Sequence, residues 1–221
     1  MKILALEFST PHRSVAVWSG GSVRGRAEIT EGCPTPALAL IEHALREARL
    51  EREQIDRVAV GLGPGSYTGI RIAIALAQGW QLARNVSLLG ISSADCIVAQ
   101  ARAAGWQGRL SLLIDAHGQQ FYRATYEIAA TGWRQTEPFR LLTPAEWPKH
   151  AQTEQIWVES PAHGWRSARE HALGPDAAVL AELAAGRSDF VPGETLAPIY
   201  LREATFLKAP PPRPMDQPDR G

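Results

Sequence analysis

The chain has 221 residues, 45% of them hydrophobic, and its 23 basic side chains balance its 23 acidic ones. This length suits two small lobes that share an interface, or one domain with an elaborated edge. The zero net charge argues against a protein that binds nucleic acid by itself. Phosphate contacts dominate the affinity for nucleic acid, and they favour an excess of basic side chains. Any contact with nucleic acid is therefore expected to run through a partner.

The cysteines and the first residues of the chain indicate the cell compartment. Cys33 and Cys96 stand far apart and outside any C-x-x-C pair, which argues against a disulfide framework or a zinc site. The apolar run after Lys2 stops at Glu7, so it is too short for the core of a signal peptide or for a membrane span. We expect a cytoplasmic protein without a membrane contact.

Short apolar runs at the start of the chain predict strands. Residues 3–8 are apolar except for Glu7, and residues 14–18 follow a polar turn that contains Pro11. A further strand is expected around residues 24–30. Together these segments predict a meander.

The hydrophobic period then lengthens. Thr35 and Pro36 fit the N-cap and the first position of a helix. The expected apolar face of this helix is formed by Leu38, Ile41, Leu45 and Ala48. Beyond it, strands are predicted at residues 57–62 and 88–91, each followed by a helix, over residues 69–84 and 92–104.

The second half of the chain begins much as the first does. Residues 110–115 predict a strand that ends in Asp115, and residues 120–127 predict the strand that returns. Glu7 closes the first strand of the chain in the same way. This weak repeat suggests a duplicated α/β lobe in which the two acids end corresponding strands.

A glycine-rich turn, GPGSYTGIR at residues 63–71, joins a predicted strand to a predicted helix. Backbone N–H groups at such a helix start can bind an anion, and glycine's freedom in φ can equally serve a tight turn. A P-loop is excluded because no Gly-Lys pair occurs, and the dinucleotide and nucleophile-elbow patterns do not fit. The residues favour a structural turn over a ligand loop. The candidate residues for either role are Gly63, Gly65, Ser66, Thr68 and Gly69.

The helix that follows the turn has small or apolar side chains in nearly every direction, which predicts burial on more than one side. One face can cover a sheet. The other needs a second helix, either from the same chain or from a partner, and the sequence leaves both readings open.

Candidate catalytic groups are few. None of the six histidines forms an H-x-x-x-H or H-E-x-x-H pair, so no metal site and no protease centre is predicted. Glu7 and Asp115 could face a magnesium-bound nucleotide. We prefer the simpler reading, in which each acid is a strand-end carboxylate bonded to turn amides.

The stretch at residues 63–71 resembles the GPGS(F/Y)TG(L/V)R signature of the TsaB (YeaZ) family. Segments at residues 1–18, 58–63, 72–82, 113–116, 121–122 and 198–202 also resemble that family, in its order. The family usually has Asp where this chain has Glu7, Arg where it has His117, and Glu where it has Gln120. The His-Ser-Glu stretch before the family's first long helix is replaced here by residues 32–36.

The resemblance implies an α/β fold of the actin, sugar kinase and Hsp70 type (ASKHA), with two lobes of mixed sheets and flanking helices. We expect an N-terminal lobe at residues 1–105, a C-terminal lobe at 106–208 and a disordered tail at 209–221. The resemblance also implies a non-catalytic subunit. Its expected partners are a TsaD-like paralogue, which threonylcarbamoylates adenosine in tRNA, and a TsaE-like ATPase.

The resemblance places partner contacts on helices of the first lobe, including the helix after the glycine-rich turn. The predicted contact residues are Ile70, Ala73, Ile74, Ala77 and Gln81. No cofactor is expected to bind tightly to the chain alone. Whether ATP or ADP binds at the partner interface, and whether the chain forms a homodimer, is left undecided. Contact with tRNA is expected only through the complex. The alternative hypothesis is an ATP-dependent small-molecule kinase of the same fold.

Overall fold

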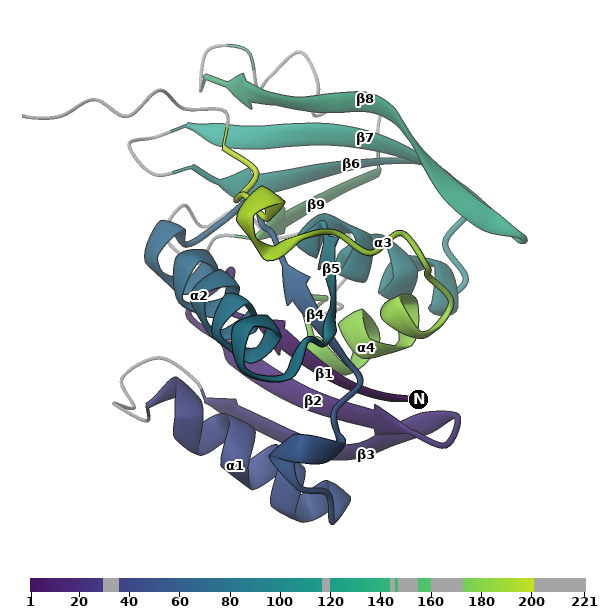
Figure 1. Cartoon of the computed structure of the whole chain (residues 1–221). Coiled ribbons are helices and arrows are strands. Elements are labelled where there is room, and N and C mark those ends of the chain that lie inside the picture. Colours follow the sequence, from purple (N-terminus) through teal and green to yellow (C-terminus); the bar gives the residue numbers. More distant parts are fainter. Residues whose placement is uncertain (30–35, 117–119, 144–145, 147–154, 160–172, 201–221) are drawn as a thin grey trace, which may run out of the picture.

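The fold is described from a computed structural model (Figure 1). The described residues are 1–29, 36–116, 120–143, 146, 155–159 and 173–200, without the side chains of 155–159. The expected tail at residues 209–221, Cys33 and His117 lie outside them.

The first sheet contains five strands in the order β3-β2-β1-β4-β5. They are β1 (Lys2–Glu7), β2 (Arg13–Ser19), β3 (Ser22–Ile29), β4 (Arg57–Gly61) and β5 (Ser87–Ile91). β1 lies antiparallel to β2 and parallel to β4. The meander predicted from the sequence is therefore confirmed, and helices make the crossovers between the parallel strands.

The second sheet repeats this plan with four strands in the order β8-β7-β6-β9. They are β6 (Gly108–Asp115), β7 (Phe121–Ala129), β8 (Gly132–Leu142) and β9 (Gln155–Glu159). β6 is antiparallel to β7 and parallel to β9, as β1 is to β2 and β4. The topology therefore agrees with a duplicated lobe.

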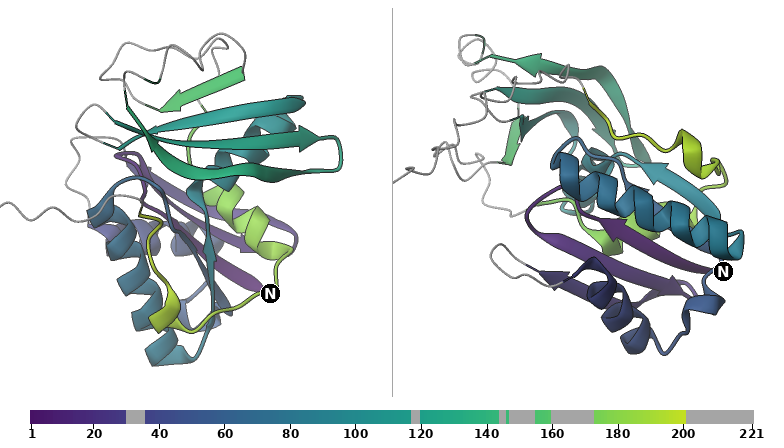
Figure 2. Two further views of the ribbon diagram at one scale, coloured as in Figure 1. Left: turned by 90° about the horizontal axis from the view of Figure 1, so that it is seen from above. Right: turned by 60° about the vertical axis from the view of Figure 1, so that its left-hand side comes forward.

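Helices cover both faces of the first sheet (Figures 1 and 2). The α-helices are α1 (Ala37–Ala48), α2 (Tyr67–Arg84), α3 (Ser93–Ala103) and α4 (Ala177–Ala185). Alternate side chains of β1 separate the two faces, since Leu4 and Leu6 belong to the core under α1 and α2. Ile3 and Ala5 belong to the core under α4, which also includes Cys96 of α3.

Helix α3 links the two sheets. Its Ala94, Ile97 and Val98 pack in one core with Leu112 and Ile114 of β6. Because Cys96 on the same helix lies in the core of the first sheet, α3 serves both lobes.

The chain after α4 returns along the first sheet, and we call residues 186–200 the C-terminal strap. The N–H of Val191 donates to the carbonyl of Leu88 in β5, and a short 3-10 helix, η4 (Gly193–Thr195), lies against α2 (Figure 1). The last strand of the first sheet, β5, ends before the expected boundary at residue 105, and the first strand of the second sheet, β6, begins after it. The helix α4 and the strap, which fall within the expected second lobe, pack on the first sheet.

One detail of the first helix differs from the prediction. Leu38 is 52% exposed, and the buried residues of α1 are Leu40, Ile41, Ala44 and Leu45. The apolar face is set by contact with β2 and β3, and the preceding residue, Ala37, packs against that core while Leu38 does not. Another short 3-10 helix, η1 (Arg52–Gln54), precedes β4.

Candidate functional site

The glycine-rich turn needs glycine at each predicted position. Gly63 and Gly65 have positive φ angles of 86° and 151°. A Cβ on Gly65 would overlap the carbonyl oxygen of Ser9, and one on Gly69 would overlap that of Phe8. Each of the three glycines of the turn thus has a positive φ or no room for a side chain, as a structural turn requires.

Several N–H groups of the turn are bonded inside the protein. Ser66 donates from its backbone to the Ser9 carbonyl at 2.6 Å, and Gly63 donates to the Ser93 hydroxyl at 3.0 Å. The backbone N–H of Gly69 donates to the Ser66 side chain, which is the N-cap of α2. These contacts favour the structural reading of the turn over an anion site. Thr68 lies exposed on the first turn of α2.

Glu7 lies buried beneath this turn, with a relative exposure of 0%. Its Oε1 accepts a hydrogen bond from the backbone N–H of Ser9 at 2.8 Å, and its Oε2 accepts one from the Ser93 hydroxyl at 2.8 Å. The carboxylate occupies the space that a side chain on Gly61 would fill. Glu7 therefore links the end of β1 to α3 directly, and to the turn through Ser9 and Ser93.

The environment of Glu7 opposes its ionisation. Burial raises the pKa of the Glu7 carboxyl, and hydrogen bonds from Ser9 and Ser93 offset only part of this effect. The negative charge of Asp176 raises the pKa further. A carboxyl group held in this way is engaged within the fold and is not presented to a nucleotide.

Asp115 does not join Glu7 in one site. Its neighbours Ile114 and Ala116 belong to the core under α3, and side chains alternate along a strand, so Asp115 leaves the sheet on the other face. Glu7, by contrast, points at Ser93 of α3. Among the described residues, no group of three or more histidine, cysteine or acidic side chains is placed to hold a metal ion.

The residues predicted as partner contacts face the inside of the chain. Ile70, Ala73, Ile74 and Ala77 lie buried in the core of the first sheet. Gln81 accepts a hydrogen bond from the N–H of Gly193 and donates to the Val86 carbonyl. This placement corrects the prediction, which could not tell the two sides of α2 apart because both are apolar or small.

The exposed side of α2 is a different stripe along the helix. It comprises Tyr67, Thr68, Arg71, Ala75, Gly79, Leu82, Ala83 and Arg84. Leu82, in the last turn of α2, is 91% exposed. We use the name exposed α2 face for this stripe.

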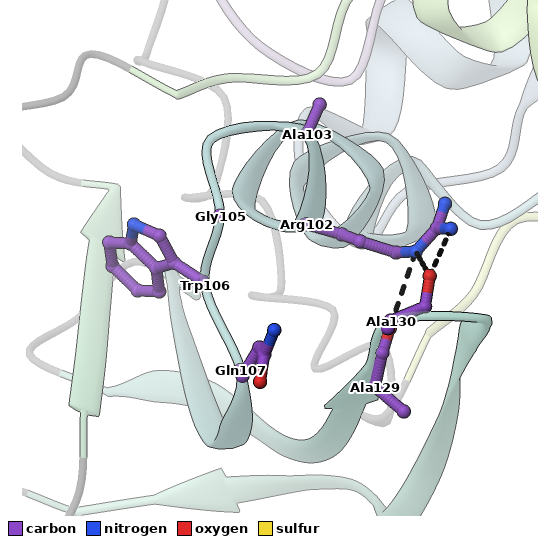
Figure 3. Close-up of a pocket in the computed structure, with 7 residues that line it drawn as sticks. All are labelled: Arg102, Ala103, Gly105, Trp106, Gln107, Ala129 and Ala130. Atoms are coloured by element: carbon purple, nitrogen blue, oxygen red, sulfur yellow. Dashed lines mark hydrogen bonds between the residues drawn. The ribbon is translucent and has the colours of Figure 1, made fainter.

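A small cavity of about 210 Å³ lies elsewhere, between the end of α3 and the β7–β8 hairpin. Figure 3 shows the guanidinium of Arg102 turned toward the hairpin, where it donates to the carbonyls of Ala129 and Ala130. The basic group of this cavity thus joins helix to hairpin. The cavity is also smaller than the usual ligand pocket of roughly 300–1,000 Å³.

No helix within the described part of the chain combines the length and the apolar character that crossing a membrane requires.

The paired sheets, with α3 shared between them, define a two-lobed fold of the actin, sugar kinase and Hsp70 type. A family model described as "TsaD: tRNA N6-adenosine threonylcarbamoyltransferase" matches residues 36–187. The chain therefore belongs to the family that this model describes, and the relatives that place it there are TsaB (YeaZ) proteins.

Relatives and solved structures agree with this placement. The Escherichia coli (strain K12) tRNA threonylcarbamoyladenosine biosynthesis protein TsaB is 28% identical, with 94% of this chain and 97% of that protein covered. The Haemophilus influenzae protein of the same name is 25% identical, with 95% and 98% covered. A crystal structure of an uncharacterized Pseudomonas aeruginosa protein with similarity to peptidase YEAZ has a TM-score of 0.73 at 28% identity, covering 91% of this chain and 99% of that one.

The steric argument for the turn predicts the effect of a single methyl group. We expect Gly65→Ala to lower the free energy of unfolding by about 3 kcal/mol, because it combines backbone strain with overlap on the Ser9 carbonyl. Gly79→Ala is the matched control in α2, since its added methyl group meets nothing, and it should stabilise by up to about 1 kcal/mol. Urea unfolding measures both. Equal effects of the two changes would show that the turn tolerates a side chain.

The raised pKa of Glu7 predicts a pH-dependent penalty. In the unfolded chain this carboxyl ionises near its usual value of about 4.3, so its stabilising contribution is complete below that pH and is lost as the pH rises toward the folded-state pKa. Glu7→Gln should therefore gain in unfolding free energy relative to wild type as the pH rises from about 4 to 7.

Urea titrations across this pH range test the prediction, with Glu182→Gln on the exposed side of α4 as the control for loss of one carboxyl group. If the unfolding free energy of wild type instead rises relative to that of Glu7→Gln as the pH increases, the hydrogen bonds outweigh burial. The pKa of Glu7 is then not raised, and the prediction is wrong.

Proposed function

We propose that the chain is a non-catalytic subunit of the machinery that makes threonylcarbamoyladenosine in tRNA, where it binds and activates a TsaD-like catalytic paralogue. Relatives named for this biosynthesis, similar over nearly their whole length, support the pathway. A TsaE-like ATPase completes the assembly, tRNA is reached only through the complex, and the chain works in the cytoplasm.

The exposed α2 face is the observation that carries the partnership. Of the six large hydrophobic side chains that lie exposed among the described residues, three belong to this surface: Tyr67 and Leu82 are on α2, and Tyr200 stacks on Tyr67. Small residues, Ala75 and Gly79, lie between the two ends of the stripe and allow close approach of another helix. A concentration of exposed apolar side chains on one face is typical of a protein interaction site.

The state of Glu7 supports a scaffold over an enzyme. Its carboxylate is fully buried and bonded to Ser9 and Ser93, so it is not poised to bind magnesium or to accept a substrate proton. The kinase alternative would need such a group in the cleft between the lobes. We propose instead that the chain stabilises the active conformation of its partner, that it binds no nucleotide tightly alone, and that any ATP or ADP lies at the partner interface.

The partnership predicts that a charge in the middle of the exposed α2 face blocks assembly. We expect Ala75→Arg to weaken binding to the TsaD-like paralogue from the same organism by about tenfold or more, because it places a desolvated charge in a close helix contact. Ala130→Arg, at the exposed β7–β8 hairpin, is the matched control and should bind as wild type does. Calorimetry on the purified proteins gives both affinities.

Reconstitution of tRNA modification with TsaC-, TsaD- and TsaE-like proteins then tests the role itself. Omission of this chain should abolish or strongly slow modification. Full modification without it contradicts the scaffold proposal, and turnover of ATP or substrate by this chain alone supports the kinase alternative.

A further inference from the structure

Two segments that stand far apart in the sequence meet at the first turn of α2. Tyr67 belongs to the glycine-rich stretch at residues 63–71, and Tyr200 belongs to the Pro-Ile-Tyr stretch at the end of the C-terminal strap. Their rings stack with centroids 4.8 Å apart and an interplanar angle of 28°. The Tyr200 hydroxyl donates to the Tyr67 carbonyl at 3.4 Å, and the N–H of Ile199 donates to the Leu62 carbonyl at 2.9 Å.

Arg71 completes this cluster from the next turn of α2. Its guanidinium lies 5.2 Å from the centre of the Tyr67 ring, and its Nη1 donates to the Tyr67 hydroxyl at 2.6 Å. No carboxylate of the described residues forms an ion pair with Arg71. Within the described residues, the cluster thus presents one positive charge that no carboxylate pairs, beside two aromatic rings.

The three side chains are exposed despite these contacts. Tyr67 is 54% exposed, Tyr200 is 37% exposed, and Arg71 is also exposed. Tyrosine and arginine are the residue types enriched where protein interfaces concentrate their binding energy. Stacking and hydrogen bonding already restrict these side chains, so a partner would lose little further entropy in ordering them.

We propose that Tyr67, Arg71 and Tyr200 form the anchor of the surface that binds the TsaD-like partner, with Arg71 pairing with a carboxylate of that partner. This proposal rests on the proposed function and extends it. The docking surface is then composite, because the C-terminal strap supplies one of its aromatic residues and holds it against α2.

A nucleobase could also stack on tyrosine and arginine side chains. Here each tyrosine already covers a face of the other, and the chain's 23 acidic side chains balance its 23 basic ones. A protein surface with one acidic side chain fits this site better than a nucleic acid strand does.

The test measures affinity for the purified TsaD-like paralogue by calorimetry at low and high salt. We expect Tyr200→Ala and Arg71→Glu each to weaken binding by about tenfold or more. Arg71→Gln should bind more weakly than wild type and lose much of the salt dependence, because the interfacial ion pair is absent. Tyr67→Phe keeps the stacked ring and should have the smallest effect.

Matched controls come from elsewhere in the chain. Phe190→Ala removes an aromatic side chain that is 38% exposed at the other end of the same strap, where it packs against Arg57. Arg134→Glu reverses an exposed charge on β8. Both should bind as wild type does. Thermal melts check that each variant is folded. If Tyr200→Ala loosens the strap, Arg71→Glu still tests the anchor, because it leaves the stacked tyrosine pair in place.

The outcomes separate the two proposals. If wild type fails to bind the paralogue, the proposed function fails. If Ala75→Arg weakens binding but Tyr200→Ala and Arg71→Glu do not, the partner binds without this anchor and only the present inference is overturned. Binding of tRNA by the chain alone that depends on Tyr67 and Tyr200, or a change confined to self-association, would also overturn it.

Discussion

The Glu7 carboxylate lies where β1, the glycine-rich turn and α3 come together, and it accepts hydrogen bonds from Ser9, just after β1, and from Ser93 of α3. One oxygen accepts from the Ser9 backbone, and the Ser9 carbonyl in turn accepts from Ser66 at the start of α2. The other oxygen accepts from Ser93, whose backbone and side chain both bond to Gly63. A single buried group thus connects the starts of the helices α2 and α3 to the end of the first strand.

The glycine spacing of the turn follows from this junction. Side chains at Gly61, Gly65 and Gly69 would overlap the Glu7 carboxylate, the Ser9 carbonyl and the Phe8 carbonyl in turn. Residues 7–9 therefore set three of the glycine positions by contact, without any ligand. A sequence pattern that resembles a phosphate loop can arise in this way from close packing of a helix start against a strand end.

Much of the fold was predictable because its local signals agree. Apolar runs bounded by turn residues identified the strands of the first sheet, and a helix after the glycine-rich turn was expected two residues later than α2 begins. The run at Ala177–Ala185 is short and almost uniformly apolar, so its pattern does not separate helix from strand, and α4 was not predicted. β8 carries Pro138 and charged residues such as Arg134 and Arg140, which obscure the signal of an edge strand.

The choice of face on α2 needed the tertiary structure. Ile70 and Ala77 pack inward while Ala75 and Leu82 point outward, yet all four are apolar, so periodicity alone could not orient the helix. Nor could the sequence show that Tyr200 meets Tyr67, because that contact depends on the strap returning past β5.

These placements connect the proposed docking surface to the body of the protein. The outer side of α2 carries the exposed residues, its inner side packs on the first sheet, and its N-terminus is held to Glu7 through Ser66 and Ser9. Through Ser93 the same carboxylate reaches α3, which packs on the second sheet. A partner bound to α2 would therefore contact an element fixed to both lobes, and a rigid attachment of this kind suits a protein that acts by holding another in shape.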